Sequence, residues 1–202
     1  MIHWTNGIRR LKACSEALEW GREFDTIDEA WEKCKRGDWM LWLLGKLSGE
    51  PDEADSRKKL VLTACQCARL ALHHVAKGET RPLQTIETSE AWARDENGVT
   101  LDMVRTAASA AYAAAAYVSY AAYVSYAADA AAAADASAAF AADAAAASAA
   151  YAADADDDAA ASAASAAAYY AYYAAAASAA EEVTLKQCAD IVRRYYPNAP
   201  EI

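Results

Sequence analysis

The chain has 202 residues, a length that fits one large domain or two small ones. Its 29 acidic and 19 basic side chains leave a formal charge of −10, and the repulsion between such a protein and phosphate backbones disfavours general nucleic-acid binding. The low glycine and proline content excludes collagen-like and loop-dominated scaffolds.

The start of the chain predicts two helices. Asn6 can cap a helix over residues 8–20, in which apolar side chains recur at helical spacing. Thr26 and Glu29 have the spacing of a capping box and open the second helix. Gly37 supplies a left-handed stop for that helix.

Three further helices are expected before the composition changes. Asp38 can cap an apolar run over residues 39–44, which is too short to span a membrane. A longer helix is predicted over residues 54–76, and Gly78 stops it. Pro82 suits the first turn of the helix that follows. No segment shows the sustained alternation of a strand.

Residues 106–180 form a tract of biased composition, with 46 alanines, seven acidic side chains and no basic one. Alanine has the highest helix propensity, and neither glycine nor proline interrupts the tract, so we expect two or three long antiparallel helices. Aspartate favours helix starts and turns, which places the turns near residues 129–135 and 154–158. The last helix is predicted over residues 159–196, ended by Pro197.

These elements together predict an all-α fold. Short helices in residues 1–100 would pack with the long alanine-rich helices of residues 101–202 in one continuous fold. Residues 106–128 and 159–180 are uncharged and long enough to span a bilayer. Alanine is only weakly apolar, however, and the mean hydropathy is −0.10, so no membrane insertion is expected.

The five cysteines are odd in number and irregularly spaced. No secretory apolar region follows Met1, so we predict a cytoplasmic protein with free thiols. On one helix, His73 and His74 cannot share a face with both Cys65 and Cys67. The sequence therefore predicts no metal site and no cofactor.

No motif for covalent or metal-dependent catalysis occurs in the chain. A nucleophile elbow, a phosphate-cradling glycine loop and a zinc-protease motif are all missing from the sequence, so we expect no enzymatic activity. Asp156, Asp157 and Asp158 lack the glycine and the distal glutamate of a calcium loop. They predict a solvated acidic turn, which can serve as a contact for a basic partner.

Arg69 lies in a mostly apolar stretch of the helix predicted over residues 54–76. Glu87 and Glu90 on the following helix are its natural ion-pair partners. The alternative is that Arg69 contacts an anionic ligand in a groove between helices. Three tryptophans would frame that groove: Trp39, Trp42 and Trp92.

The tyrosines provide another candidate site. Tyr169 and Tyr170 belong to a cluster that places aromatic rings on more than one face of a helix. Packing against neighbouring helices is one interpretation. In the other, the surplus rings line a pocket that stacks a base.

Six segments, read in order, carry a resemblance to known proteins. They are Ala13–Trp20, Ala30–Cys34, Gly37–Leu43, Cys65–Leu72, Ile86–Arg94 and Ala189–Pro197. Their order resembles that of an immunity-protein family of bacteria and phages, whose members are helical. The resemblance implies an all-α protein that binds and neutralises a factor in microbial conflict, without a catalytic residue.

Two functions follow from these observations. In the first, the protein is a non-catalytic inhibitor of a toxin or defence protein, and its acidic surface is steered to a basic target. In the second, it is a phage-encoded sponge that sequesters a cyclic nucleotide or an ADP-ribose-type signal in a pocket lined by aromatic and arginine side chains. A homo-oligomer is compatible with both functions.

Overall fold

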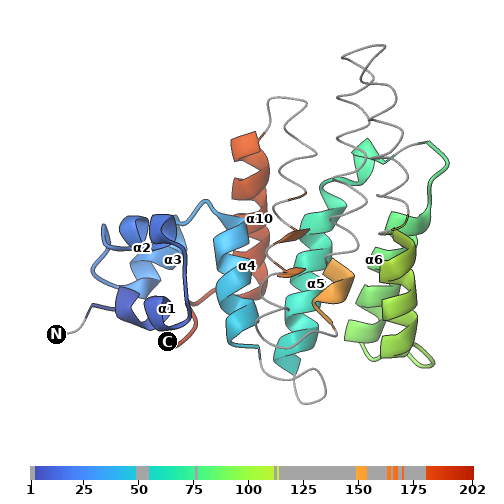
Figure 1. Ribbon diagram of the computed structural model, residues 1–202, viewed down its shortest axis with the longest axis horizontal. Coiled ribbons are helices and arrows are strands. Elements are labelled where there is room, and N and C mark those ends of the chain that lie inside the picture. The colour runs from blue at the N-terminus through green and yellow to red at the C-terminus, as the bar shows by residue number, and fades with distance from the viewer. Residues whose placement is uncertain are drawn as a thin grey trace, which may run out of the picture.

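The computed structural model describes residues 3–48, 55–75, 77–111, 113, 149–153, 163–164, 166–167, 170 and 181–202. These residues form helices and no strand, which confirms the all-α fold. The longer helices of this part of the chain stand side by side, and the short N-terminal helices lie at one end of the row (Figure 1). The labelled helices are α1 (Thr5–Arg10), α2 (Ser15–Gly21), α3 (Ile27–Lys33), α4 (Gly37–Lys46), α5 (Asp55–Arg69), α6 (Arg81–Ala93) and α10 (Glu181–Tyr195).

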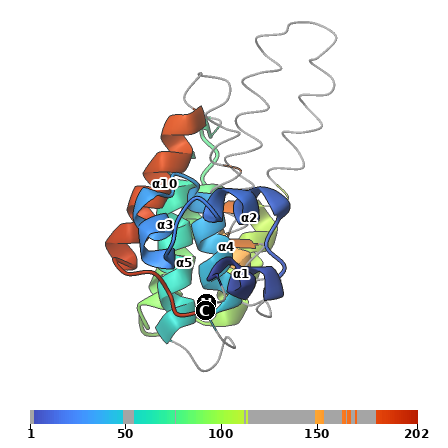
Figure 2. The same ribbon diagram turned by 90° about the vertical axis from the view of Figure 1, so that its left-hand side faces the viewer.

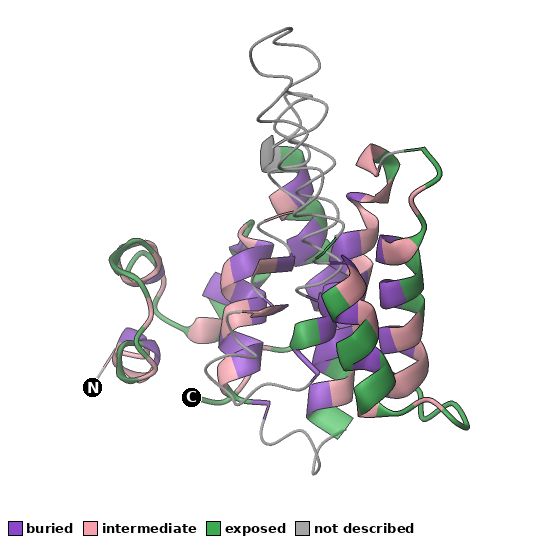
Figure 3. Cartoon of the chain, turned by 45° about the vertical axis from the view of Figure 1, so that its right-hand side comes forward, coloured by how far each residue is buried: buried purple, intermediate pink, exposed green. Residues whose placement is uncertain are grey.

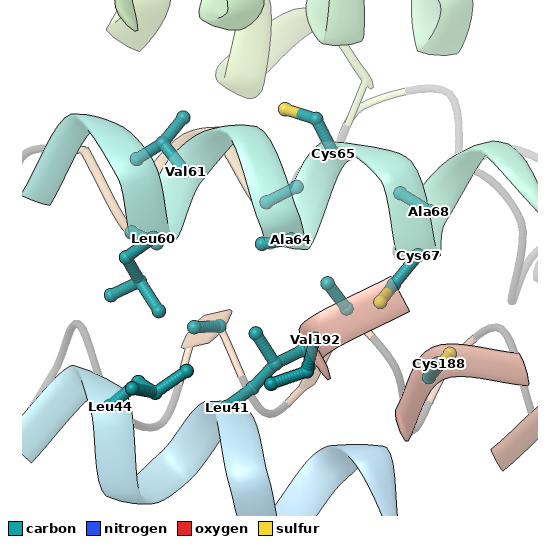
Figure 4. Packing of buried hydrophobic residues seen from close by; sticks show 14 of the residues in the cluster. Leu41, Leu44, Leu60, Val61, Ala64, Cys65, Cys67, Ala68, Cys188 and Val192 are labelled. Carbon is teal, nitrogen blue, oxygen red and sulfur yellow. The ribbon is translucent and has the colours of Figure 1, made fainter. Parts of the chain in front are cut away.

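The hydrophobic core lies where α4, α5 and α10 meet. α5 packs against α6 and α10, and α10 also packs against α4. Leu41 of α4, Leu60 of α5 and Val192 of α10 are fully buried and point toward one another (Figure 4). Figure 3 shows the buried faces of these helices turned inward. Burial of such side chains stabilises a fold by about 1.5–3 kcal/mol each, so this core dominates the stability of the bundle.

The start of α4 lies directly against α10. A Cβ atom added to Gly37 would lie 2.4 Å from Cβ of Cys188 and 2.7 Å from the backbone nitrogen of Ala189. The prediction that Gly37 ends a helix was wrong, because this glycine begins α4 and permits the close approach of the two helices. Asp38 does not cap α4 as predicted, and its carboxylate pairs with Arg36.

The helix predicted over residues 8–20 is broken in two. Lys12 has a φ of 68°, in the left-handed region that ends a helix, so α1 stops at Arg10 and α2 begins at Ser15. The cap predicted at Asn6 was also wrong, since α1 begins before it. The cap at Thr26 is confirmed, because its Oγ1 accepts a hydrogen bond from the Glu29 backbone nitrogen at 3.2 Å.

The helices over residues 55–93 follow the prediction, except that the first of them is shorter than expected. α5 ends at Arg69, and a 3-10 turn over Leu72–His74 replaces the predicted end of that helix. α6 contains Pro82 in its first turn, as expected. Residues 101–111 are helical, and Thr85 of α6 donates a hydrogen bond to the Ala107 carbonyl at 2.8 Å.

The described parts of the alanine-rich half belong to the same bundle. Arg57 of α5 is fully buried, and its Nη1 donates to the Ala152 carbonyl at 3.1 Å. α10 ends at Tyr195, just before Pro197, as predicted. Most of the predicted long helices, both of their turns and the start of the last helix near residue 159 lie outside the described residues. No described helix is long and apolar enough to cross a membrane.

The C-terminal segment holds the three short helices to the bundle. We call α1–α3 the N-terminal unit. The Trp31 indole nitrogen donates to the Tyr196 carbonyl at 3.0 Å, and Arg193 donates to the Trp31 carbonyl at 3.1 Å and to the Cys34 carbonyl. The tail then runs back toward α1 (Figure 2), where the side chain of Ile202 packs against Gly7.

Candidate functional site

A cavity of about 360 Å³ lies between the N-terminal unit and α4. Five of the six tryptophans of the chain line it. The remaining wall is mostly aliphatic, and the charged side chains in it are Lys12 and Asp38. Its size falls at the lower end of small-molecule sites, which span about 300–1,000 Å³. The tryptophans are Trp4, Trp20, Trp31, Trp39 and Trp42.

The N-terminal unit positions three of these rings. Trp4 donates from its indole nitrogen to the Phe24 carbonyl at 2.9 Å, which ties the start of α1 to the segment after α2. Trp31 is fixed in the same way by Tyr196. Trp20 contacts Trp39 across the cavity, with ring centroids 5.9 Å apart and planes at 59°. This tilted arrangement is one that aromatic pairs prefer.

Arg36 joins the two sides of the cavity. Its Nε and Nη2 donate to the two carboxylate oxygens of Asp38 at 2.9 and 2.7 Å, and its Nη1 lies 3.4 Å from Glu16 of α2. The guanidinium also lies 4.3 Å from the centre of the Trp39 ring, within cation–π range. Asp38 is buried, and the bidentate contact with Arg36 neutralises its negative charge.

Few side chains of the cavity wall can form hydrogen bonds apart from its tryptophans. The indole N–H groups of Trp20, Trp39 and Trp42 form no hydrogen bond with any described residue. Burial raises the pKa of the Cys34 thiol to about 11, so the thiol stays protonated at neutral pH, and it donates to the Arg36 carbonyl. The cavity thus offers mainly apolar aromatic surface, and the one carboxylate in its wall is already paired.

No family model, curated protein or solved structure matches this chain. The resemblance to immunity proteins therefore stays a prediction.

The structure separates the tryptophans that were expected to frame one groove. Trp39 and Trp42 line the cavity, whereas Trp92 lines a different pocket beside Lys58 and Asp95. Arg69 lines neither. The groove that was to combine the arginine with three tryptophans is not formed by these residues.

Arg69 takes part in an ion-pair cluster around the buried carboxylate of Glu90. Its Nε and Nη2 donate to the two oxygens of Glu90 at 2.9 Å each, Gln66 donates to the same carboxylate at 2.8 Å, and Arg94 lies 3.3 Å from it. Of the two predicted partners, Glu90 forms the ion pair with Arg69, and Glu87 is exposed. Burial alone would raise the pKa of Glu90, but the hydrogen bonds and charges of the arginines outweigh burial and hold this pKa below its ordinary value. This geometry is that of a structural ion pair between α5 and α6.

The other predicted site residues are placed only in part. Tyr170 is half-buried and packs against the core. Tyr169, Asp156, Asp157 and Asp158 lie outside the described residues.

The cysteines are free thiols. Cys65 points toward α6, where its thiol lies 4.0 Å from the Ile86 carbonyl, whereas Cys67 points toward Cys188 of α10 (Figure 4). The thiols of Cys65 and Cys67 therefore face different helices, and His73 is exposed. No group of metal-binding side chains is found among the residues that the structure describes.

Sequence reasoning missed most of the cavity. Trp4, Trp20 and Trp31 were not singled out, nor was Lys12. One signal was available, because five of the six tryptophans occur before residue 43. Such a concentration of large amphipathic rings in a short stretch of sequence is typical of a binding surface.

Proposed function

We propose that this protein is a non-catalytic binding protein that sequesters a small ligand with a planar ring, such as a nucleotide signal, in the tryptophan cavity. The observation that carries the proposal is the convergence of five tryptophans on one cavity of about 360 Å³. Stacking on an aromatic side chain contributes about 1–3 kcal/mol per base, and several rings lie within reach of one ligand here.

The cavity provides binding chemistry without reaction chemistry. Its charged groups are Lys12 and the Arg36-paired Asp38, and its buried thiol, Cys34, is protonated at neutral pH. Among the described residues, neither lining thiol, Cys14 or Cys34, forms a hydrogen bond with a side chain that could act as a general base. A protein that binds a signal without converting it lowers the free concentration of that signal, which is how a sponge would act in microbial conflict.

Binding can be tested by calorimetric titration of the purified chain with cyclic AMP, a cyclic dinucleotide and ADP-ribose. We expect at least one of them to bind with a micromolar or lower Kd and to be recovered unchanged after heating. Trp39→Ala should weaken that binding about 10- to 100-fold, because it removes a stacking surface.

Trp92→Ala is the matched control, since Trp92 lies in a different pocket. This variant should bind as tightly as the unmodified chain. Equal losses in the two tryptophan variants, or no heat of binding with any of the three compounds, would contradict the proposal.

A second candidate is the inhibitor of a basic toxin or defence protein, which is favoured by the formal charge of −10. Its expected contacts are Asp156, Asp157 and Asp158. Changing these three residues to asparagine should slow association with a basic protein target at low salt and have little effect at high salt. A pull-down from a toxin-bearing strain provides the target, and salt-independent binding would contradict this mechanism.

A further inference from the structure

Lys12 occupies an unusual position in the wall of the cavity. Its φ of 68° lies in the left-handed region, where a glycine is normally found. The Ala13 nitrogen donates to the Ile8 carbonyl and the Lys12 nitrogen to the Arg9 carbonyl, both at 3.0 Å. These two bonds form the Schellman motif that ends α1, with Lys12 at the position that favours glycine most strongly. The chain therefore keeps a long cationic side chain where a glycine would be more stable.

Lys12 is exposed, and no ion pair with a described residue balances its charge in the cavity wall. Asp38 is neutralised by Arg36, which also pairs with Glu16. Among the described residues, no ion pair includes Lys12, although it lines the same cavity.

We propose that the tryptophan cavity selects planar aromatic ligands that carry one negative group, and that Lys12 binds this group. The inference rests on the proposed function and specifies the class of ligand. The tryptophan rings of the cavity would hold the aromatic part, while the ammonium group of Lys12 would bind the anion at the wall. Both a carboxylate and a phosphate supply this chemistry, and the conformation of Lys12 is a backbone strain of the kind that is retained at functional sites.

Four probes with the same ring system test the selectivity by calorimetry: 2-naphthoate, 2-naphthyl phosphate, neutral 2-naphthamide and cationic 2-naphthylmethylammonium. We expect the two anions to bind about 10-fold or more tightly than the amide, and the cation to bind most weakly. The ratio of naphthoate to naphthyl phosphate tells whether the natural ligand carries a carboxylate or a phosphate. If the amide binds as well as the anions, the cavity binds rings but the inference about charge is wrong. If no probe binds, this inference is wrong, and the proposed function fails with it only if the three nucleotides do not bind either.

Variants of Lys12 separate its charge from its backbone conformation. Lys12→Gln removes the charge but keeps a side chain at the strained backbone position. Lys12→Gly removes both the charge and the strain. Each should weaken naphthoate binding about 10-fold and leave naphthamide binding unchanged. Lys12→Gly should also raise Tm by about 2 °C, because glycine adopts a positive φ without strain.

Two further variants complete the test. Lys12→Arg should keep the preference for anions, and Lys35→Gln should have no effect, since Lys35 is an exposed lysine that does not line the cavity. A Lys12→Gly variant that is more stable and still binds naphthoate at full strength would overturn the role of Lys12.

Discussion

Gly37→Ala should lower the free energy of unfolding by about 3 kcal/mol. The added methyl group would lie 2.4 Å from Cβ of Cys188 and 2.7 Å from the Ala189 nitrogen, so it would press on the backbone of α10 and not on a movable side chain. Since α10 also packs against α5, relief of the clash requires a shift of a helix within the core. Urea unfolding followed by circular dichroism measures the change.

Gly7→Ala is the matched control for this substitution. It makes the same chemical change at another helical glycine, but its closest neighbours are side-chain atoms of Ile202 at 3.1–3.3 Å, close to the chain end. That side chain can move aside, and alanine favours the helix, so the change in unfolding free energy should stay within about 0.5 kcal/mol. Equal stability of the two alanine variants would show that α4 and α10 are not in close contact at Gly37.

Local signals in the sequence were sufficient to predict a helix boundary where nearby residues determine it. The cap at Thr26, the early proline of α6 and the end of α10 before Pro197 all depend on residues within a few positions. The break at Lys12 was not predictable in this way, because neither glycine nor proline marks it. It depends on the two hydrogen bonds that close α1 and on the burial of Ile8 beside it.

Gly37 shows that a glycine can indicate either the end of a helix or the close approach of another element. A glycine after a helix commonly ends that helix, and the sequence was interpreted in this sense. In the structure it is required for the approach of α10, whose residues are distant in sequence. A single sequence contains no direct sign of such a long-range contact, which explains why the boundary between α3 and α4 was misplaced.

The candidate site could be predicted only in fragments. Trp39 and Trp42 were identified because they lie in one apolar run, and the ion pair of Arg69 with Glu90 because both residues lie on adjacent predicted helices. The convergence of Trp4, Trp20 and Trp31 on the same cavity depends on the turns between three short helices, and these turns were not resolved by periodicity.

Glu90→Ala should lower the free energy of unfolding by about 2–3 kcal/mol. The Glu90 carboxylate is buried and accepts hydrogen bonds from Arg69, Gln66 and Arg94, so its loss leaves two cations and an amide without their shared acceptor. The loss falls below that of a fully buried pair, because both arginines are partly exposed and can reach water. Glu87→Ala, at an exposed glutamate of the same helix, should change stability by less than about 0.5 kcal/mol.

The pH dependence of stability isolates the charge of Glu90. The pKa of this carboxyl is lowered in the folded chain, whereas in the unfolded chain it is close to the ordinary value of about 4.3. Its contribution is therefore fully present above about pH 4.3 and is lost as the pH falls through the folded pKa. Glu90→Gln keeps the size of the side chain but cannot titrate, so the difference in unfolding free energy between the two proteins should narrow below pH 4. A difference that stays constant between pH 7 and pH 3 would show that Glu90 stabilises the contact between α5 and α6 by packing and not by its charge.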